Sequence, residues 1–315
     1  MKKYIYLIAF MTVALMSSVT TKAQEVAAYS QYLVQPTLIN PALNGFDGGQ
    51  QLFLNYKRLW AGFDGTPSLV TMNYHGAIDD RSGFGVFLFN ERVAAVNRFR
   101  GSLAYSFRIE AGDWNIGLGL AADLSQERLS SDVLNSDLTD PNDPIINAAA
   151  EGLLFFDANF GMYARYKESF FFGISAPHLV RARLTDVETT DDTEAKGFQS
   201  FTATVGNRFH FDEYSLSLEP SFMVRKVFDG PMIYDANLLT VLLDDQLYGG
   251  LTYRYTAGTG SGVGVLIGTR VGNLSVFYSY DAGFGTFQAF NTGGHEVSLA
   301  FDIAKKDRIG DRKMF

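Results

Sequence analysis

The sequence predicts an all-β protein: a transmembrane, antiparallel, up-and-down β-barrel of about 14 strands. Three observations lead to this fold class. Apolar and polar residues alternate almost everywhere after Gly45, as they do in strands with two different faces. Tight turns alternate with longer loops between the expected strands, a pattern typical of outer-membrane barrels. The composition, 47% hydrophobic and 14% aromatic with 31 glycines, suits a barrel ringed by aromatic side chains.

Residues 1–23 have the features of a cleaved signal peptide. Met1–Lys3 carries positive charge, Tyr4–Met16 is apolar, and a small, polar stretch leads to a cleavage site between Ala23 and Gln24. The apolar run is too short to span a bilayer as a retained helix, and no later stretch has about 20 unbroken apolar residues. We therefore expect export, with neither a disulfide bond nor a lipoprotein anchor, because the chain has no cysteine.

The stretch Tyr29–Gly45, within a lead-in of residues 24–50, is expected to be ordered but not helical. Pro36 and Pro41 remove backbone donors and disfavour helical geometry at the residues before them, and Asn44-Gly45 is a turn signal. One interpretation is a plug that fills the barrel lumen, and the other is a periplasmic lead-in to the first strand. A plug would need partners for its buried polar groups. The expected contacts on the segment and on the wall are Tyr29, Gln31, Tyr32, Asn40, Arg100, Arg254 and Glu219.

Residues 51–303 are expected to form the barrel itself. Alternation is clearest in Arg98–Arg108, where aromatic and aliphatic residues occupy one face and arginines and serines the other. In a soluble sandwich the apolar face would point inward, whereas in a membrane barrel it points outward to lipid. The expected strands lie near residues 51–58, 67–75, 83–91, 98–108, 114–124, 153–166, 169–176, 201–211, 214–225, 231–242, 246–256, 262–271, 273–282 and 295–303.

The connections between these strands favour the membrane barrel. Turns such as Ala111-Gly112 and Gly272-Asn273 are tight, while loops such as Ser125–Gly152 and Pro177–Ser200 are long. A sandwich has no reason to sort its connections in this way, whereas an outer-membrane barrel has short periplasmic turns and long outer loops. The two longest loops are acidic, which is typical of a solvated outer surface; calcium bridging or partner docking is the alternative, although their acidic residues lack EF-hand spacing.

Residues 304–315 form a separate basic tail with five Lys or Arg residues. Because the strand count is even, we expect this tail to be periplasmic, together with the N-terminus. The tail is either a solvated extension or a docking segment for a periplasmic partner, whose orientation its charge would help to set.

Known chemical motifs are absent from the sequence. The net charge of −8 argues against nucleic-acid binding. The four histidines do not have zinc-site spacing, and the chain has neither a phosphate loop nor a Gly-x-Ser-x-Gly motif, so we expect no metal, no cofactor and no enzymatic activity. A hydrolase would need a Ser–His pair from neighbouring strands. His210 and Ser217 lie on adjacent expected strands, a coincidence that many strand pairs would produce.

Two motifs carry a resemblance to a known family. Tyr29-Ser30-Gln31-Tyr32 followed by Ile39-Asn40-Pro41-Ala42-Leu43-Asn44-Gly45 resembles the start of PorP/SprF proteins, and Gly293–Leu299 resembles their last strand. The family usually has an aromatic residue where this chain has Leu43. The similarity extends over nearly the whole mature chain, but its motifs carry no chemistry.

The resemblance implies an outer-membrane barrel, embedded in lipid, that anchors or assists a component of the type IX secretion system or of gliding motility. The partner would be another secretion component or a large secreted surface adhesin, and the sequence leaves both open. The alternative function is a transport barrel for a small or hydrophobic solute. A continuous path through the lumen would favour the transporter, and an occluded lumen the scaffold.

Overall fold

The computed structural model describes residues 29–60, 65–130, 146, 150–185, 200–284 and 293–304. The expected signal peptide, nearly all of the basic tail and most of the two acidic loops lie outside these described residues. The strands are β1 (Gln50–Arg58), β2 (Ser68–Ala77), β3 (Ser82–Val93), β4 (Val96–Ala111), β5 (Trp114–Leu129), β6 (Leu153–Tyr166), β7 (Phe170–Ala176), β8 (Ala182–Arg183), β9 (Phe201–Asn207), β10 (Phe209–Phe211), β11 (Leu216–Lys226), β12 (Ile233–Leu242), β13 (Leu247–Thr256), β14 (Gly260–Val271), β15 (Leu274–Phe284) and β16 (Gly294–Ala304).

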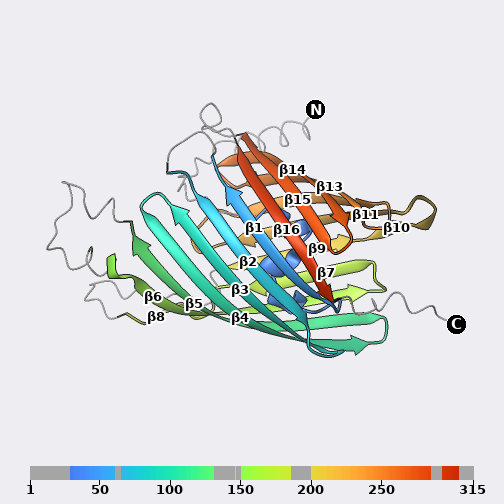
Figure 1. Ribbon diagram of the computed structural model, residues 1–315, viewed down its shortest axis with the longest axis horizontal. Coiled ribbons are helices and arrows are strands. Elements are labelled where there is room, and N and C mark those ends of the chain that lie inside the picture. Colours follow the sequence, from blue (N-terminus) through green and yellow to red (C-terminus); the bar gives the residue numbers. More distant parts are fainter. Residues whose placement is uncertain are drawn as a thin grey trace, which may run out of the picture.

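The strands close into a single antiparallel barrel (Figure 1). Each strand pairs with its neighbours in chain order, β16 pairs with β1, and β9 links β7 to β11. β9 and β10 are two parts of one wall strand, interrupted at Arg208, and β8 is a two-residue addition to β6. Over the described residues the wall therefore has 14 strands, and the predicted fold class and strand number are confirmed.

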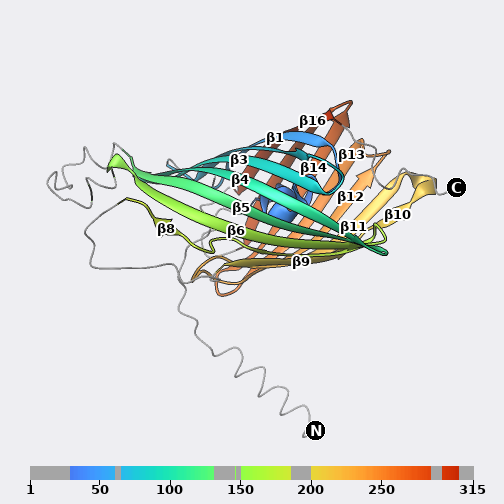
Figure 2. The same ribbon diagram turned by 90° about the horizontal axis from the view of Figure 1, so that it is seen from below.

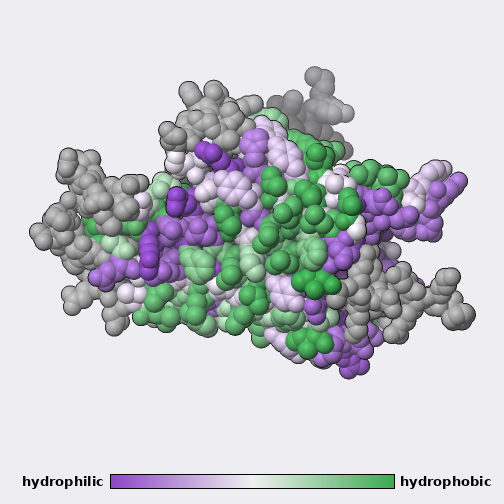
Figure 3. All heavy atoms as spheres, in the orientation of Figure 1, coloured by the Kyte–Doolittle hydropathy of each residue, from purple (hydrophilic) through white to green (hydrophobic). Residues whose placement is uncertain are grey.

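The alternation seen in the sequence separates the two faces of the wall. On β4, Leu103 and Tyr105 are 66% and 52% exposed on the outside, whereas Ser106 and Arg108 are 4% and 8% exposed and point into the lumen. Exposed leucines, tyrosines and phenylalanines continue around the outer face of the other strands. Figure 3 shows a broad hydrophobic area over the strands, with hydrophilic residues gathered toward the two ends. This surface matches a bilayer better than water.

The two ends of the barrel differ in their connections. At the turn end, tight turns join β2 to β3, β4 to β5, β6 to β7, β10 to β11, β12 to β13 and β14 to β15, and β16 also finishes there. At the loop end, the connections β1–β2, β5–β6, β7–β9 and β15–β16 are long. Two loop-end connections, β3–β4 and β13–β14, are also short. The long connections therefore all lie at the loop end, but not every connection at that end is long.

Three short 3₁₀ helices precede the first strand: η1 (Gln31–Leu33), η2 (Pro36–Leu38) and η3 (Pro41–Leu43). Figure 2 shows this stretch, in blue, surrounded by the strands. Among the described residues, none of the helices is long and apolar enough to cross a membrane.

The outward and inward faces of β4 should respond differently to a new charge. We expect Leu103→Lys to lower the free energy of unfolding in lipid vesicles by about 2–4 kcal/mol, because it places an ammonium group against hydrocarbon near the middle of the strand. Ser102→Lys should cost clearly less, because Ser102 faces the lumen and is the cross-strand partner of Asp123. Urea titration of both variants measures the difference, and equal losses would contradict the assignment of faces.

Candidate functional site: the filled lumen

The lumen segment, Tyr29–Asp47, contains many buried residues although it belongs to none of the strands. Gln31 is 0% exposed and Ala42 1%, although both precede the first strand and neither belongs to the wall. Its contacts reach several sides of the wall, including β16, β12 and β6. A polar stretch can be buried to this extent only if its donors and acceptors are satisfied.

An ionic cluster holds the segment near the loop end. Lys57 of β1 is 1% exposed, and its ammonium lies 3.1 Å from Asp281 of β15 and 3.2 Å from Glu296 of β16. Ser30 completes the cluster: its backbone N–H donates to Glu296 at 2.8 Å, and its hydroxyl accepts from Lys57 at 3.0 Å and contacts Asp281. Asn55 donates to the other oxygen of Glu296 at 2.7 Å. One buried cation therefore faces two carboxylates, and the N–H groups of the segment and wall compensate the second negative charge.

The aromatic and amide side chains beside Ser30 extend this attachment around the barrel. The hydroxyl of Tyr29 hydrogen-bonds that of Thr71 on β2 at 2.9 Å. Gln31 donates to the backbone carbonyl of Glu296 at 3.0 Å. Tyr32 reaches the opposite wall, where its hydroxyl lies 3.0 Å from Asp235 and 2.9 Å from Asn237 on β12.

The Asn40-Pro41 step fixes the turn that follows. The side-chain oxygen of Asn40 accepts from the backbone N–H of Ala42 at 3.0 Å and so caps η3, while Pro41 occupies the first helical position, where no N–H is needed. The amide nitrogen of Asn40 donates to the carbonyl of Met162 on β6 at 3.0 Å. Ser175 of β7 donates to the carbonyl of Ile39 at 2.7 Å. The same asparagine thus shapes the segment locally and attaches it to the wall.

The segment leaves the lumen through a second set of contacts near the turn end. Ser106 and Arg108, successive inward residues of β4, donate to the carbonyls of Asn44 and Phe46. Asp47 forms an ion pair with Arg165 of β6 at 2.7 Å. The chain then turns through Gly48 and Gly49, whose φ angles of +74° and +73° favour glycine, and enters β1.

Glycines on the wall make room for η3. A Cβ added at Gly83 would lie 2.0 Å from the Asn44 carbonyl oxygen, one at Gly119 2.3 Å from the Ala42 nitrogen, and one at Gly161 2.1 Å from the Asn40 side chain. Such distances are far inside van der Waals contact. We call this surface the glycine groove; it comprises the inward glycines of β3 to β7: Gly83, Gly85, Gly117, Gly119, Gly161 and Gly173.

The four expected contacts on the segment all bind the wall, but the three expected contacts on the wall do not all bind the segment. Arg254 reaches the segment through Asp235, to which it donates at 2.8 Å and which also contacts Tyr32. Arg100 lies 3.8 Å from Asp123 and stacks over phenylalanine rings of β3, and Glu219 pairs with Arg208 at 2.7 Å. The partners of Arg100 and Glu219 in these contacts are wall residues, not segment residues.

Sequence analysis did not identify several residues that bind the segment. Lys57 and Asp235, the centres of the two charged contacts, were not among the expected contacts, and neither was the glycine groove. Their signal is present in the alternation: Lys57 follows Phe53 and Asn55 at spacing two, and Gly83-Phe84-Gly85 and Gly117-Leu118-Gly119 repeat glycine at the same spacing. Inward glycines at successive positions indicate a close approach by another part of the chain.

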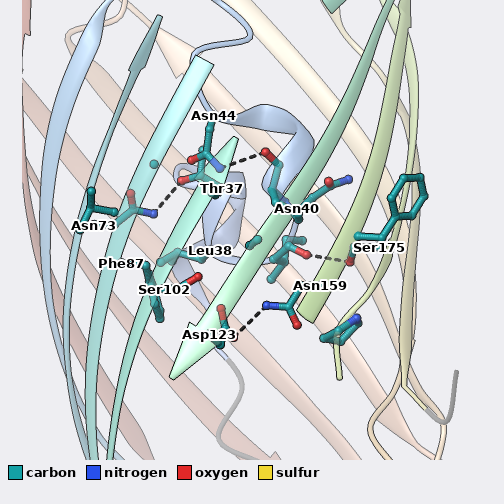
Figure 4. A pocket seen from close by; sticks show the side chains of 18 of the residues that line it. Thr37, Leu38, Asn40, Asn44, Asn73, Phe87, Ser102, Asp123, Asn159 and Ser175 are labelled. Atoms are coloured by element: carbon teal, nitrogen blue, oxygen red, sulfur yellow. Dashed lines mark hydrogen bonds between the residues drawn. The ribbon is translucent and has the colours of Figure 1, made fainter. Parts of the chain in front are cut away.

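The segment leaves one cavity of about 110 Å³ beside it (Figure 4). It lies between η2–η3 and the inner faces of β2 to β7. Three buried polar atoms on its lining residues have no hydrogen-bond partner among the described residues: Asn73 Oδ1, Arg100 Nε and Asp123 Oδ1. The volume is enough for a few water molecules, and the chemistry of the walls is polar.

The Ser–His pair considered from the sequence is formed, at the β10–β11 hairpin. His210 Nδ1 lies 2.7 Å from Ser217 Oγ, and His210 Nε2 lies 2.9 Å from Asp212. The two residues are direct cross-strand partners, so the register of the hairpin accounts for the contact. The imidazole is 60% exposed and the Asp212 side chain 93% exposed, so water screens the charge that would have to orient a catalytic histidine. Within the described residues no group of three or more His, Asp or Glu could hold a metal ion.

A side chain in the glycine groove should compete with the lumen segment. We expect Gly119→Val to lower the free energy of unfolding by about 1–3 kcal/mol, because the new side chain would overlap the backbone of Ala42. Gly249→Val is the matched control, since nothing lies within 4 Å of a Cβ at Gly249. Urea unfolding in detergent micelles compares the two. If Gly119→Val lowers the free energy of unfolding equally in a barrel that lacks residues 25–44, the loss does not come from a clash with the segment.

Removing the cation of the ionic cluster should be costly. Lys57→Met leaves Asp281 and Glu296 buried without their counter-ion, and we expect a loss of about 3–5 kcal/mol. Arg58→Met, one residue along and exposed on the outer face, should cost no more than about 1 kcal/mol. The shift in the unfolding midpoint, read from the mobility of the unheated protein on gels, measures both; similar shifts would show that the cluster contributes little.

Comparisons with known proteins place this geometry in a family. The fold is similar to that of the "CymD monoaromatic hydrocarbon channel" (12% identity, covering 89% of this chain and 95% of that chain, TM-score 0.55) and of the P. putida toluene transporter TodX (11% identity, 86% and 94%, TM-score 0.54). At these identities the likeness shows a shared outer-membrane barrel fold. No curated protein matches the sequence. The model of the type IX secretion system membrane protein family PorP/SprF matches residues 21–301, and the chain therefore belongs to that family.

Proposed function

We propose that this protein is a non-enzymatic scaffold of the outer membrane, which anchors or assists a component of type IX secretion or a gliding adhesin. Family membership supports the association with secretion. The observation that carries the scaffold role is the filled lumen: Ser30 binds β1 and β16, Tyr32 binds β12, and Asn40 binds β6. A segment attached to several sides of the wall leaves little room for a transported solute.

The proposed organisation follows from the two ends of the barrel. After removal of residues 1–23, residues 24–50 provide the plug, residues 51–303 the lipid-embedded barrel, and residues 304–315 a basic tail. The long loops face the cell surface, where a secreted adhesin would be met, and the turn end faces the periplasm. Because β16 finishes at the turn end, the tail is available to a periplasmic partner of the secretion machine.

A transport barrel is the second candidate. Two observations favour it: a fold shared with a hydrocarbon channel and a toluene transporter, and the polar cavity beside the segment. For this function the segment would have to move aside or leave a continuous path. The two candidates therefore differ in the conductance of the intact protein.

Deletion of the plug distinguishes the candidates. We expect the full-length protein to be closed in a planar bilayer, and a variant lacking Glu25–Asn44 behind an intact signal to insert and conduct ions, because the strands are unchanged. The deletion variant should also recover less of its secretion partners from detergent extracts if the plug organises their binding. An intact protein that already conducts, or a deletion that alters neither conductance nor partner recovery, would favour the transporter.

A further inference from the structure

We infer that the lumen segment enters the barrel at the loop end and runs toward the turn end, so that the chain before Tyr29 lies on the cell-surface side. With the signal peptide cleaved near Gln24, the N-terminus of the mature protein would then be accessible from outside the cell. This inference rests on the proposed orientation, with the loops outward, and it replaces the expectation that both termini are periplasmic.

The contacts of the segment form a ladder along the barrel. Ser30 is bound at the loop end: Lys57 is one residue from the end of β1, and Glu296 is the third residue of β16. Tyr29 contacts Thr71, the fourth residue of β2 from the same end. The first residues of the segment are therefore within a few residues of the loops on three neighbouring strands.

Tyr32 is still near the loop end, because it contacts Asp235 and Asn237, the third and fifth residues of β12 from that end. The later residues lie toward the other end. Phe46 is bound by Arg108, which lies three residues before the end of β4 at the turn end. Asp47 is bound by Arg165, the last residue but one of β6 at the same end. The direction of the chain along the lumen is thus set by contacts with six different strands.

The lumen leaves no free path by which the chain before Tyr29 could return to the turn end. From the level of Lys57 to that of Gln50, β1 runs about 23 Å, at about 3.3 Å a residue, or about 16–19 Å along the barrel axis when a strand tilt of about 35–45° is included. The residues between the expected cleavage site and Tyr29 span about 17 Å at most, so they would have to be almost fully extended to cover this distance. The route is occupied by the segment itself, in which Tyr32, Gln35, Asn40, Ala42 and Phe46 are buried.

The absence of cysteine makes a direct test possible. Single-cysteine variants Ala27→Cys, Thr259→Cys and Asn273→Cys are exposed on intact cells to a membrane-impermeant maleimide, and again after the outer membrane is permeabilised. Thr259 is exposed at the loop end and Asn273 at the turn end, so they report the two sides. We expect Ala27→Cys to react on intact cells as completely as Thr259→Cys, and Asn273→Cys to react only after permeabilisation.

The two controls separate the possible failures. If Asn273→Cys reacts on intact cells and Thr259→Cys does not, the proposed orientation is wrong. If the controls behave as expected but Ala27→Cys reacts only after permeabilisation, the threading is wrong and the orientation stands. If the thiol at residue 27 reacts under neither condition, an epitope tag inserted between Gln24 and Glu25 takes its place. Detection of this tag only after permeabilisation would also overturn the inference.

Discussion

The structure depends on satisfying the polar inner face of a closed barrel. Lipid outside forces the apolar residues of each strand outward, and the period of two then forces their polar neighbours inward. In a barrel of 14 strands these inward groups do not all reach one another across the lumen. The lumen segment supplies the missing partners: Ser30 compensates the cluster around Lys57, and Tyr32 adds a hydroxyl to the carboxylate of Asp235. The segment therefore satisfies part of the polar inner face of the wall.

The two sides of the wall meet this requirement differently. From β12 through β16 to β1 the inner face offers buried charges, and the segment there contributes polar side chains and one backbone N–H. From β3 to β7 the inner face offers glycines, and the segment there contributes backbone and the compact Asn40-Pro41-Ala42 turn. Charge fixes the first of these halves, whereas in the second half shape acts together with the contacts that Arg108 and Arg165 make near the turn end. In the glycine groove, an added side chain would overlap the segment. In the charged half, removal of a side chain would leave a buried ion unpaired.

The barrel could be predicted from the sequence because each strand carries its own signal. Alternation fixes the face of every residue, and the turns fix the ends, so the 14 wall strands lie within a few residues of their expected positions. The break between β9 and β10 was not foreseen, because Arg208 continues the alternation of both parts. For the segment, the prolines and the Asn-Gly step indicated order without a helix, but not its direction. Its partners, such as Lys57 and Glu296, are far away in the sequence, and no local pattern connects them to Ser30.

The positions of these partners relate the segment to the closure of the barrel. Ser30 binds the first strand through Lys57 and the last two through Asp281 and Glu296, so this attachment is complete only when β16 pairs with β1. The glycine groove, by contrast, is formed by β3 to β7, which lie within the first half of the wall. The turn-end half of the segment can therefore bind before the ring is complete, because its contacts need only the first half of the wall. The same residues that fill the barrel thus join its first and last strands.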